Sequence, residues 1–283
     1  MKISGYTSLT GVIATPIRHS LSPAIHNTAF DKLGLDYVYL AFEVSDEQFA
    51  GAVTSIRALG MRGVNISMPY KQKIIPYLDK LSPAAKLVKA VNTVVNDNGL
   101  LTGHITDGTG FMRSLTEENH DVIGKKIVVA GAGGAAMAIC VQAALDGVKE
   151  LSLFNRTKEK SEHIVNLINE KTNCKAKSFS MHDNENLRKE LADSVIYINT
   201  TSVGMKPCEN ENLIKEAYTL HPGLIVADII YNPRKTKLLE MAETRGCKTV
   251  NGLGMILYQG AEAFKLWTGC EMPVDYVKEM VFK

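Results

Sequence analysis

Short apolar runs alternate with longer amphipathic stretches along the chain, and this alternation indicates strands followed by helices. Apolar residues at every second position mark strands, and a helical spacing of apolar residues marks helices. In the amino-terminal part we predict strands at 10–14, 36–42 and 63–66, helices at 24–33, 46–59, 71–78 and 83–88, and a hairpin of strands 92–96 and 100–104. Asp97-Asn98-Gly99 joins the hairpin strands, because these residue types favour tight turns. The alternation predicts the α/β class.

The strongest single pattern lies between Lys126 and Arg156, where a strand, a glycine turn, a helix and a second strand follow in order. The apolar run 126–130 suits a buried parallel strand. The turn Gly131-Ala132-Gly133-Gly134-Ala135-Ala136 lets the backbone approach a pyrophosphate at the start of a helix over 135–145. The second strand is 151–154, and further strands are expected at 175–178, 195–199, 224–228 and 248–251. This order predicts a Rossmann domain with a doubly wound parallel sheet. An ordinary glycine-containing loop is the plainer alternative.

The residues that end the second strand bear on the choice of dinucleotide. An NAD-specific domain usually places Asp or Glu there to bind the ribose 2′-hydroxyl, whereas this chain has Asn155-Arg156-Thr157 and then Lys160. A guanidinium can stack on adenine and bind a 2′-phosphate, with Thr157 as a hydroxyl donor and Lys160 as a second cation. The pattern favours NADP. The alternative is a solvated basic helix start.

Length and composition fit a two-domain enzyme. The chain has 283 residues, 45% of them hydrophobic and 22% charged. We expect a substrate domain at 1–112 plus 251–283, to which an amphipathic helix over 255–268 returns, and a dinucleotide domain at 113–250. A net charge of +2 gives no indication of nucleic-acid binding, and five scattered cysteines lack the close pairs of metal or redox motifs. We therefore expect no metal site. Residues 1–20 are polar and broken by glycine and proline, so we expect a cytoplasmic protein without a membrane segment.

Ser20 and Ser22 stand at the start of a predicted helix, with Ser22 as its N-cap and Pro23 at its first helical position. Two hydroxyls beside the positive end of a helix can bind a carboxylate. A simple helix cap explains the same residues, so the pair alone does not decide between the two interpretations.

Lys71 follows Pro69, which we expect to open the helix over 71–78. The macrodipole disfavours a cation in the first turn of a helix, so such a lysine exchanges its proton more readily. Asp107 either caps the next helix or faces Lys71 and orients its ammonium. A solvated surface lysine is the plainer alternative.

A set of segments, taken together, resembles the shikimate dehydrogenase family in the same order and over nearly the whole chain. The segments are Ser20-Leu21-Ser22-Pro23, 65–71, Val91-Asn92-Thr93, Thr106-Asp107-Gly108, the Gly131 turn, Asn155-Arg156-Thr157, Asn199-Thr200-Thr201-Ser202, Asn251-Gly252-Leu253-Gly254-Met255 and Tyr258-Gln259. Within the family the chain is most similar to the quinate/shikimate branch, through Ser67-Met68-Pro69 with Lys71-Gln72, residues 81–87, and Leu266-Trp267-Thr268-Gly269.

The resemblance implies reversible hydride transfer between a nicotinamide cofactor and shikimate or 3-dehydroshikimate, in the biosynthesis of aromatic amino acids through chorismate. It implies that Lys71 transfers the proton and that Asp107 positions Lys71. The ring carboxylate would be bound by Ser20 and Ser22, with Tyr39 nearby, and the ring hydroxyls by Ser67, Asn92, Thr106, Asp107, Tyr231 and Gln259. Serine at position 67, where most shikimate-only members have threonine, relaxes the packing and would admit quinate.

The resemblance also implies a cofactor site. It would comprise Gly131, Ala132, Gly133, Gly134, Ala135, Asn155, Arg156, Thr157, Lys160, Thr201, Ile229, Gly252 and Met255. The quinate/shikimate branch accepts NAD whereas the basic cluster favours NADP, so both cofactors stay open. The expected partner is a small-molecule substrate, in a monomer or homodimer, without nucleic acid or membrane. One alternative is a non-catalytic dinucleotide sensor, which would have no use for Lys71. Another is a two-domain dehydrogenase acting on a folate, which should lack the paired serines.

Overall fold

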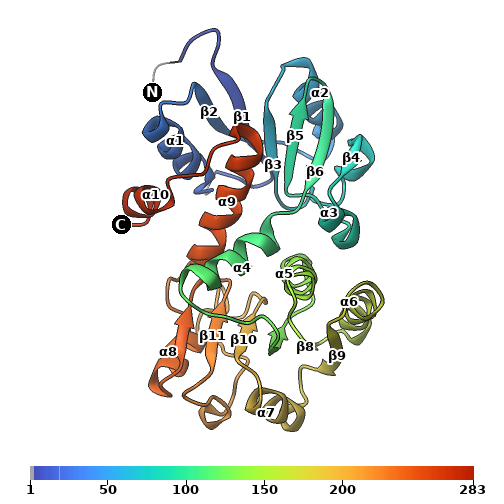
Figure 1. Ribbon diagram of the computed structural model, residues 1–283, viewed down its shortest axis with the longest axis vertical. Helices are drawn as coiled ribbons and strands as arrows, with labels where there is room; N and C mark the ends of the chain where they lie inside the picture. The colour runs from blue at the N-terminus through green and yellow to red at the C-terminus, as the bar shows by residue number, and fades with distance from the viewer. Residues whose placement is uncertain (1–2, 19) are drawn as a thin grey trace. The chain divides into compact units, whose positions relative to one another are not determined.

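A computed structural model describes residues 3–18 and 20–283, and the chain divides into two compact units. Unit 1 is Met1–Thr106 with Leu257–Lys283, and unit 2 is Asp107–Ile256. The boundaries expected from the sequence, after residues 112 and 250, lie inside helix α4 (Asp107–Glu117) and just before helix α9 (Gly252–Thr268). Both units consist of a sheet and surrounding helices (Figure 1), which confirms the predicted α/β class. No helix in the described ranges is long and apolar enough to cross a bilayer.

Unit 2 contains the predicted doubly wound sheet. Its six strands lie in the order β12-β11-β10-β7-β8-β9 and pair in parallel throughout, which is the Rossmann arrangement. The strands are β7 (Lys126–Ala130), β8 (Glu150–Asn155), β9 (Lys175–Ser180), β10 (Ile196–Asn199), β11 (Ile225–Asp228) and β12 (Lys248–Val250). The helices besides α4 are α5 (Gly134–Leu145), α6 (Lys158–Lys171), α7 (Asn184–Ala192), η2 (Ala217–Thr219) and α8 (Lys237–Thr244).

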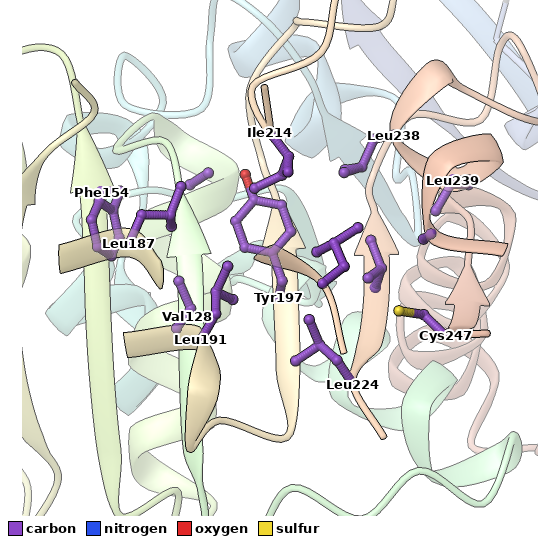
Figure 2. Close-up of a cluster of buried hydrophobic side chains, with 14 residues drawn as sticks. Val128, Phe154, Leu187, Leu191, Tyr197, Ile214, Leu224, Leu238, Leu239 and Cys247 are labelled. Atoms are coloured by element: carbon purple, nitrogen blue, oxygen red, sulfur yellow. The ribbon is translucent and has the colours of Figure 1, made fainter. Parts of the chain in front are cut away.

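Helices bury the unit 2 sheet on both faces. Figure 2 shows Val128, Phe154 and Tyr197 of three strands on the same face as Leu191 of α7 and Leu238 of α8, within one buried cluster. Side chains alternate along a strand, so the equally buried neighbours in β7 and β8 face the helices on the other side. Burial on both faces explains why these strands read as continuous apolar runs in the sequence.

Unit 1 contains a mixed sheet of six strands in the order β2-β1-β3-β5-β6-β4. Strand β5 is antiparallel to both of its neighbours, and the other pairings are parallel. The strands are β1 (Ser8–Ala14), β2 (Tyr37–Glu43), β3 (Gly63–Ile66), β4 (Lys80–Leu81), β5 (Thr93–Asp97) and β6 (Leu100–His104). The helices besides part of α9 are α1 (Ser22–Leu33), α2 (Phe49–Ala58), η1 (Ile75–Tyr77), α3 (Pro83–Val88) and α10 (Val274–Val281).

Helix α9 is fixed to the unit 1 sheet by its last turns. The Trp267 side chain is 1% exposed, and its indole nitrogen donates to the Val94 carbonyl at 3.0 Å. A Cβ at Gly63 would overlap the indole, so only glycine fits there. The Arg62 guanidinium donates to the carbonyl of Trp267 at 2.8 Å and to the carboxylate of Asp97 at 2.8 Å. These contacts hold the last turn of α9 against the sheet.

The predicted helix over 71–78 is wrong. Residues from Met68 to Ile74 form successive turns, and only a short 3₁₀-helix follows at Ile75–Tyr77. Pro76 has no backbone N–H to donate, and its ring clashes with a preceding helical turn, so an α-helix cannot run through this segment. Lys71 therefore does not lie at the positive end of a helix.

The predicted N-cap at Ser22 is also wrong. Helix α1 begins at Ser22, its N-cap residue is Leu21, and Pro23 lies in its first turn. The backbone N–H of Ser22 donates to the Ser20 hydroxyl at 3.2 Å, so the Ser20 side chain occupies the end of the helix. Most other differences from the predicted elements lie within two or so residues of their ends, where helix and strand limits are least defined.

Candidate functional site

The polar residues singled out in unit 1 gather at one edge of its sheet. Strands β1 and β3 are parallel and end together, with Ile13 opposite Ile66. Strand β5 starts at the same edge because it runs antiparallel to β3, with Thr93 opposite Asn65, and β6 ends there at His104. The segments that enter or leave these strand ends carry Ser20, Ser22, Ser67, Lys71, Asn92 and Thr106.

Asn92 is the centre of this group. Its side chain is 3% exposed, and its Oδ1 accepts the backbone N–H of Thr106 at 2.8 Å. Its Nδ2 donates to the Thr106 hydroxyl at 3.0 Å and lies 3.4 Å from Gln259 Oε1. The Thr106 hydroxyl in turn donates to the Gln259 carbonyl at 3.1 Å. Three of the predicted substrate residues are thus brought together, although they come from three separate parts of the chain.

Asn65 and Thr93, for which no role was predicted from the sequence, belong to the same network, and Asn65 links it to the predicted residue Tyr39. Asn65, 7% exposed, donates from Nδ2 to the Asn92 carbonyl and to the Thr93 hydroxyl, both at 3.0 Å. Its Oδ1 accepts the hydroxyl of Tyr39 at 2.7 Å. Tyr39 itself is fully buried. The signal in the sequence was an asparagine inside the short apolar strand Gly63-Val64-Asn65-Ile66, where a buried amide needs partners.

The remaining unit 1 candidates lie in segments between elements or, for Ser22, at the first residue of α1. Ser20, Ser22, Ser67 and Lys71 are all partly buried. The Ser67 N–H donates to the Ile13 carbonyl at 3.0 Å, which fixes the turn to the end of β1. The Lys71 carbonyl accepts the N–H of Val91 at 2.8 Å, which joins the Lys71 turn to the segment that carries Asn92. Backbone bonds therefore position both residues without a helix.

The glycine turn of unit 2 has a glycine of positive φ followed by an exposed helix start. Gly131 has a φ of +108°, and a Cβ there would lie 2.5 Å from the Thr200 hydroxyl, so this position needs glycine. Gly133 and Gly134 open helix α5 and are exposed, and a Cβ at either would have no described atom within 4 Å. Ala132 and Ala135 are partly buried. The open helix end leaves backbone N–H groups accessible to an anion, so these residues fit the pyrophosphate of a dinucleotide.

The end of strand β8 carries the basic cluster. Asn155 is partly buried, and its side-chain amide donates to the Thr157 carbonyl at 2.7 Å, which shapes the turn after the strand. Arg156, Thr157 and Lys160 are exposed beside it. The strand tip itself carries no acidic side chain, so the arrangement suits a 2′-phosphate better than a bare 2′-hydroxyl.

A second buried network supports the loop after strand β10. Asp228 is 1% exposed, and its carboxylate accepts from Thr236 at 2.7 Å and from the amide of Asn199 at 3.1 Å. Burial raises the pKa of Asp228, and these hydrogen bonds oppose that rise. The other end of the Asn199 amide accepts the hydroxyl of Thr201 at 2.8 Å. Ile229, next to Asp228, is partly buried. The sequence analysis did not identify Asp228 or Thr236.

Gly252 has a packing role. A Cβ there would overlap the carbonyl of Ile229, and the Gly252 N–H donates to the Ile230 carbonyl at 3.0 Å. The glycine therefore lets α9 start against the loop that follows β11. Met255, in the next turn, and Tyr231, in that loop, are partly buried.

Asp107 is the first residue of α4 and is 8% exposed. A carboxylate in the first turn of a helix is stabilised by the macrodipole. The next residue, Gly108, packs so closely on α5 that a Cβ would overlap the Ala138 carbonyl. That packing fixes the start of α4 within unit 2. In the described part of the chain, no group of three His, Cys, Asp or Glu side chains is arranged to hold a metal ion.

Two family models match the chain. The model for the shikimate dehydrogenase substrate binding domain matches residues 12–94, which include most of the unit 1 site. The model for the shikimate 5'-dehydrogenase C-terminal domain matches residues 252–281.

Whole-chain relatives give the same result. A shikimate dehydrogenase (NADP(+)) from Listeria innocua is 63% identical, over 99% of this chain and 98% of its own. The structure of shikimate 5-dehydrogenase from Listeria monocytogenes in complex with shikimate and NAD is 62% identical, covers 100% of this chain and 99% of its own, and has a TM-score of 0.97. A quinate dehydrogenase from Corynebacterium glutamicum in complex with NAD is 29% identical, covers 98% and 99%, and has a TM-score of 0.89. The chain therefore belongs to the shikimate dehydrogenase family.

Proposed function

We propose that the protein catalyses the reversible, NADP-dependent reduction of 3-dehydroshikimate to shikimate. The observation that carries this proposal is the cluster of hydroxyl and amide side chains at the unit 1 sheet edge, in a chain 63% identical to a shikimate dehydrogenase (NADP(+)). A cyclic polyhydroxy acid needs several fixed donors and acceptors, and a site of this kind rejects analogues that lack a hydroxyl.

Each proposed residue has a chemical role. Ser20 and Ser22 would bind the ring carboxylate, and Ser67, Asn92, Thr106, Tyr231 and Gln259 would bind ring hydroxyls. The nicotinamide of the cofactor supplies or accepts the hydride. As hydride reaches the carbonyl carbon, its oxygen becomes negative, and Lys71 would stabilise that charge and deliver a proton. Asp107 would be the second catalytic residue.

The cofactor would bind to unit 2. Backbone N–H groups at Gly133 and Gly134 would bind the pyrophosphate, and Thr201, Ile229 and Met255 would contribute to the nicotinamide end. Arg156, with Thr157 and Lys160, would bind the 2′-phosphate of NADP. NAD stays a second cofactor, because the solved relative at 62% identity was determined with NAD.

Quinate is a second candidate substrate. Ser67 follows β3 at the site edge, where a side chain smaller than threonine leaves room beside the ring. The 29% identical relative is named a quinate dehydrogenase.

We also propose a cytoplasmic location. All five cysteines are free thiols, and Cys140, Cys174 and Cys247 are buried. Unpaired thiols are typical of a reducing compartment.

A two-by-two assay tests the proposed function. Purified protein is incubated with shikimate or quinate against NADP or NAD, and formation of the reduced nicotinamide is followed by absorbance. We expect the largest kcat/KM for shikimate with NADP. Absence of turnover with all four combinations would contradict the proposal, and a preference for quinate would make quinate the main substrate.

A further inference from the structure

The buried amide of Asn65 has an orientation that its neighbours determine. One end lies 3.0 Å from the Asn92 carbonyl, which can only accept a hydrogen bond, so that end is the NH₂ group. The other end is therefore the oxygen, and the Tyr39 hydroxyl at 2.7 Å must donate to it. The backbone carbonyl of Asn92 thus assigns the orientation of the Asn65 amide.

The orientation continues through Thr93 to Asn92. The Thr93 hydroxyl accepts from Asn65 Nδ2 at 3.0 Å and donates to Asn92 Oδ1 at 3.1 Å. Asn92 Oδ1 also accepts the Thr106 N–H at 2.8 Å, and a backbone N–H can only donate. The Thr106 N–H therefore requires the oxygen of Asn92 at this end. The Thr93 hydroxyl can donate to that oxygen, because it takes the Asn65 N–H with a lone pair and keeps its hydrogen for Asn92. Its NH₂ faces the Thr106 hydroxyl and Gln259 Oε1.

We propose that Asn65 is a positioning residue. It fixes the side-chain amide of Asn92 so that its NH₂ group faces the site that binds a substrate hydroxyl. The proposal rests on the proposed function, because it assumes that Asn92 binds a ring hydroxyl. The chain of hydrogen bonds from Tyr39 through Asn65 and Thr93 to Asn92 is called the amide relay below. The amide relay orients the NH₂ of Asn92 toward Thr106 and Gln259, so a ring hydroxyl that takes the place of Gln259 Oε1, 3.4 Å away, would accept from Asn92.

The amide relay also changes the role of Tyr39. A phenol has one hydrogen, and in Tyr39 that hydrogen is donated to Asn65. With its hydrogen used in this bond, Tyr39 does not donate to the carboxylate itself.

Asn65→Leu tests the relay because leucine has nearly the same shape and no polar atoms. The Asn92 carbonyl keeps its bond from the Ile66 N–H at 2.8 Å, so the strand pairing survives the substitution. We expect kcat/KM for shikimate to fall by roughly tenfold or more, because one buried hydrogen-bond network is removed. KM for NADP should stay unchanged.

Asn96→Leu is the matched control. Asn96 is 8% exposed in the same strand as Thr93, donates to the Met61 carbonyl at 2.8 Å, and accepts the Gly99 N–H at 2.7 Å. Among the residues that the structure describes, its side chain bonds only Ile56, Met61 and Gly99, none of which belongs to the amide relay. We expect this variant to lose thermal stability as Asn65→Leu does, while its kcat/KM for shikimate stays within about twofold of wild type.

Asn65→Asp gives a readout that a purely structural role would not change. A neutral carboxylic acid can donate to the Asn92 carbonyl and accept from Tyr39 as the amide does, whereas the carboxylate can only accept. Burial raises the pKa of such an acid, so the change from neutral acid to carboxylate falls in the pH range of the assay. We expect kcat/KM of Asn65→Asp, divided by that of wild type, to rise as the pH is lowered from about 9 to about 5.

A double-mutant cycle with Asn92→Ala decides whether Asn65 acts through Asn92. If it does, Asn65→Leu should have little further effect on kcat/KM once Asn92 is alanine. Fully multiplicative effects would overturn the proposal, as would a pH-independent ratio for Asn65→Asp or a kcat/KM for Asn65→Leu within twofold of wild type.

A measurement without substrate separates this proposal from the proposed function. The side-chain NH₂ resonances of Asn92, assigned by their loss in Asn92→Ala, should move in Asn65→Leu and not in Asn96→Leu. Unmoved Asn92 resonances would overturn the relay even in an active enzyme. Moved resonances in a protein that does not oxidise shikimate would keep the relay geometry and contradict the function of the site.

Discussion

His26 lies in the aromatic core of unit 1, where its charge state should control acid stability. Its ring stacks on Tyr39 with centroids 4.4 Å apart, and the Trp267 ring is 5.2 Å away. The side chain is 0% exposed, and neither ring nitrogen has a hydrogen-bond partner in the described part of the chain. Burial therefore lowers the pKa of His26 from 6.5 to about 3.

The sign of the effect follows from the protons bound in each state. Below the ordinary pKa of 6.5 the unfolded chain protonates His26 and the folded chain does not, so stability falls as pH falls from about 6.5 toward about 3. The free energy of unfolding then changes by up to ~1.4 kcal/mol per pH unit. Between pH 8 and pH 5 the total loss is about 2 kcal/mol.

His26→Phe and His26→Leu remove this titration. Between pH 8 and pH 5, the free energy of unfolding of both variants, from urea titrations, should fall about 2 kcal/mol less than that of wild type. Acidic residues that also lose stabilisation in acid, such as Asp79 and Asp183, are common to all the proteins and cancel. His163→Leu, at an exposed position on α6, is the control for removal of a histidine. Parallel pH dependences in wild type and both His26 variants would refute the argument.

Three further predictions concern the proposed site. Lys71→Ala should lower kcat roughly a hundredfold or more while the dissociation constant of shikimate, from calorimetry, changes little; wild-type turnover would exclude Lys71. Arg156→Gln should raise KM for NADP about tenfold or more and leave KM for NAD unchanged, because only NADP carries the 2′-phosphate; equal changes would exclude the clamp. Gly131→Ala should cost about 1–3 kcal/mol of stability and weaken dinucleotide binding, measured by denaturation and fluorescence titration, because its φ is +108°; an unchanged midpoint would contradict the strain.

The sequence was most informative where a buried segment is bounded by glycine or proline. The strands at 63–66 and 126–130 and the helix at 83–88 have the predicted bounds. In the strand at 126–130, the signal was a continuous apolar run before a glycine turn. The Ser82 hydroxyl accepts the N–H of Ala85 at 3.2 Å, as an N-cap does.

Local patterns failed where a helix signal and a turn signal overlap. Ile74, Ile75 and Leu78 have helical spacing, but Pro76 prevents an α-helix between them, and the segment folds as turns. At α1 the sequence predicted Ser22 as the N-cap. In the structure the Ser20 hydroxyl takes the first N–H of the helix, a detail that depends on the path of the preceding loop.

The amide relay shows why the site could be only partly predicted. Residue type and family resemblance identify Asn92, Thr106 and Gln259, whereas Asn65 gains its role from partners on other strands and segments. Those partners meet through the pairing of β3 with β5, which is a non-local contact. Sequence periodicity shows that Asn65 is inside the sheet, but the orientation of its amide requires the three-dimensional neighbours.

The same rule of orientation operates in unit 2. Asp228, as a carboxylate, can only accept, so the end of the Asn199 amide that faces it at 3.1 Å is the NH₂. The oxygen of Asn199 then accepts both the N–H and the hydroxyl of Thr201, at 3.0 and 2.8 Å. A buried amide costs free energy unless its partners are satisfied, so each unit gives up apolar burial to hold an asparagine in one orientation. Because Asn92 and Thr201 are the residues held, these buried asparagines define the hydrogen-bonding groups that the substrate and the cofactor would meet.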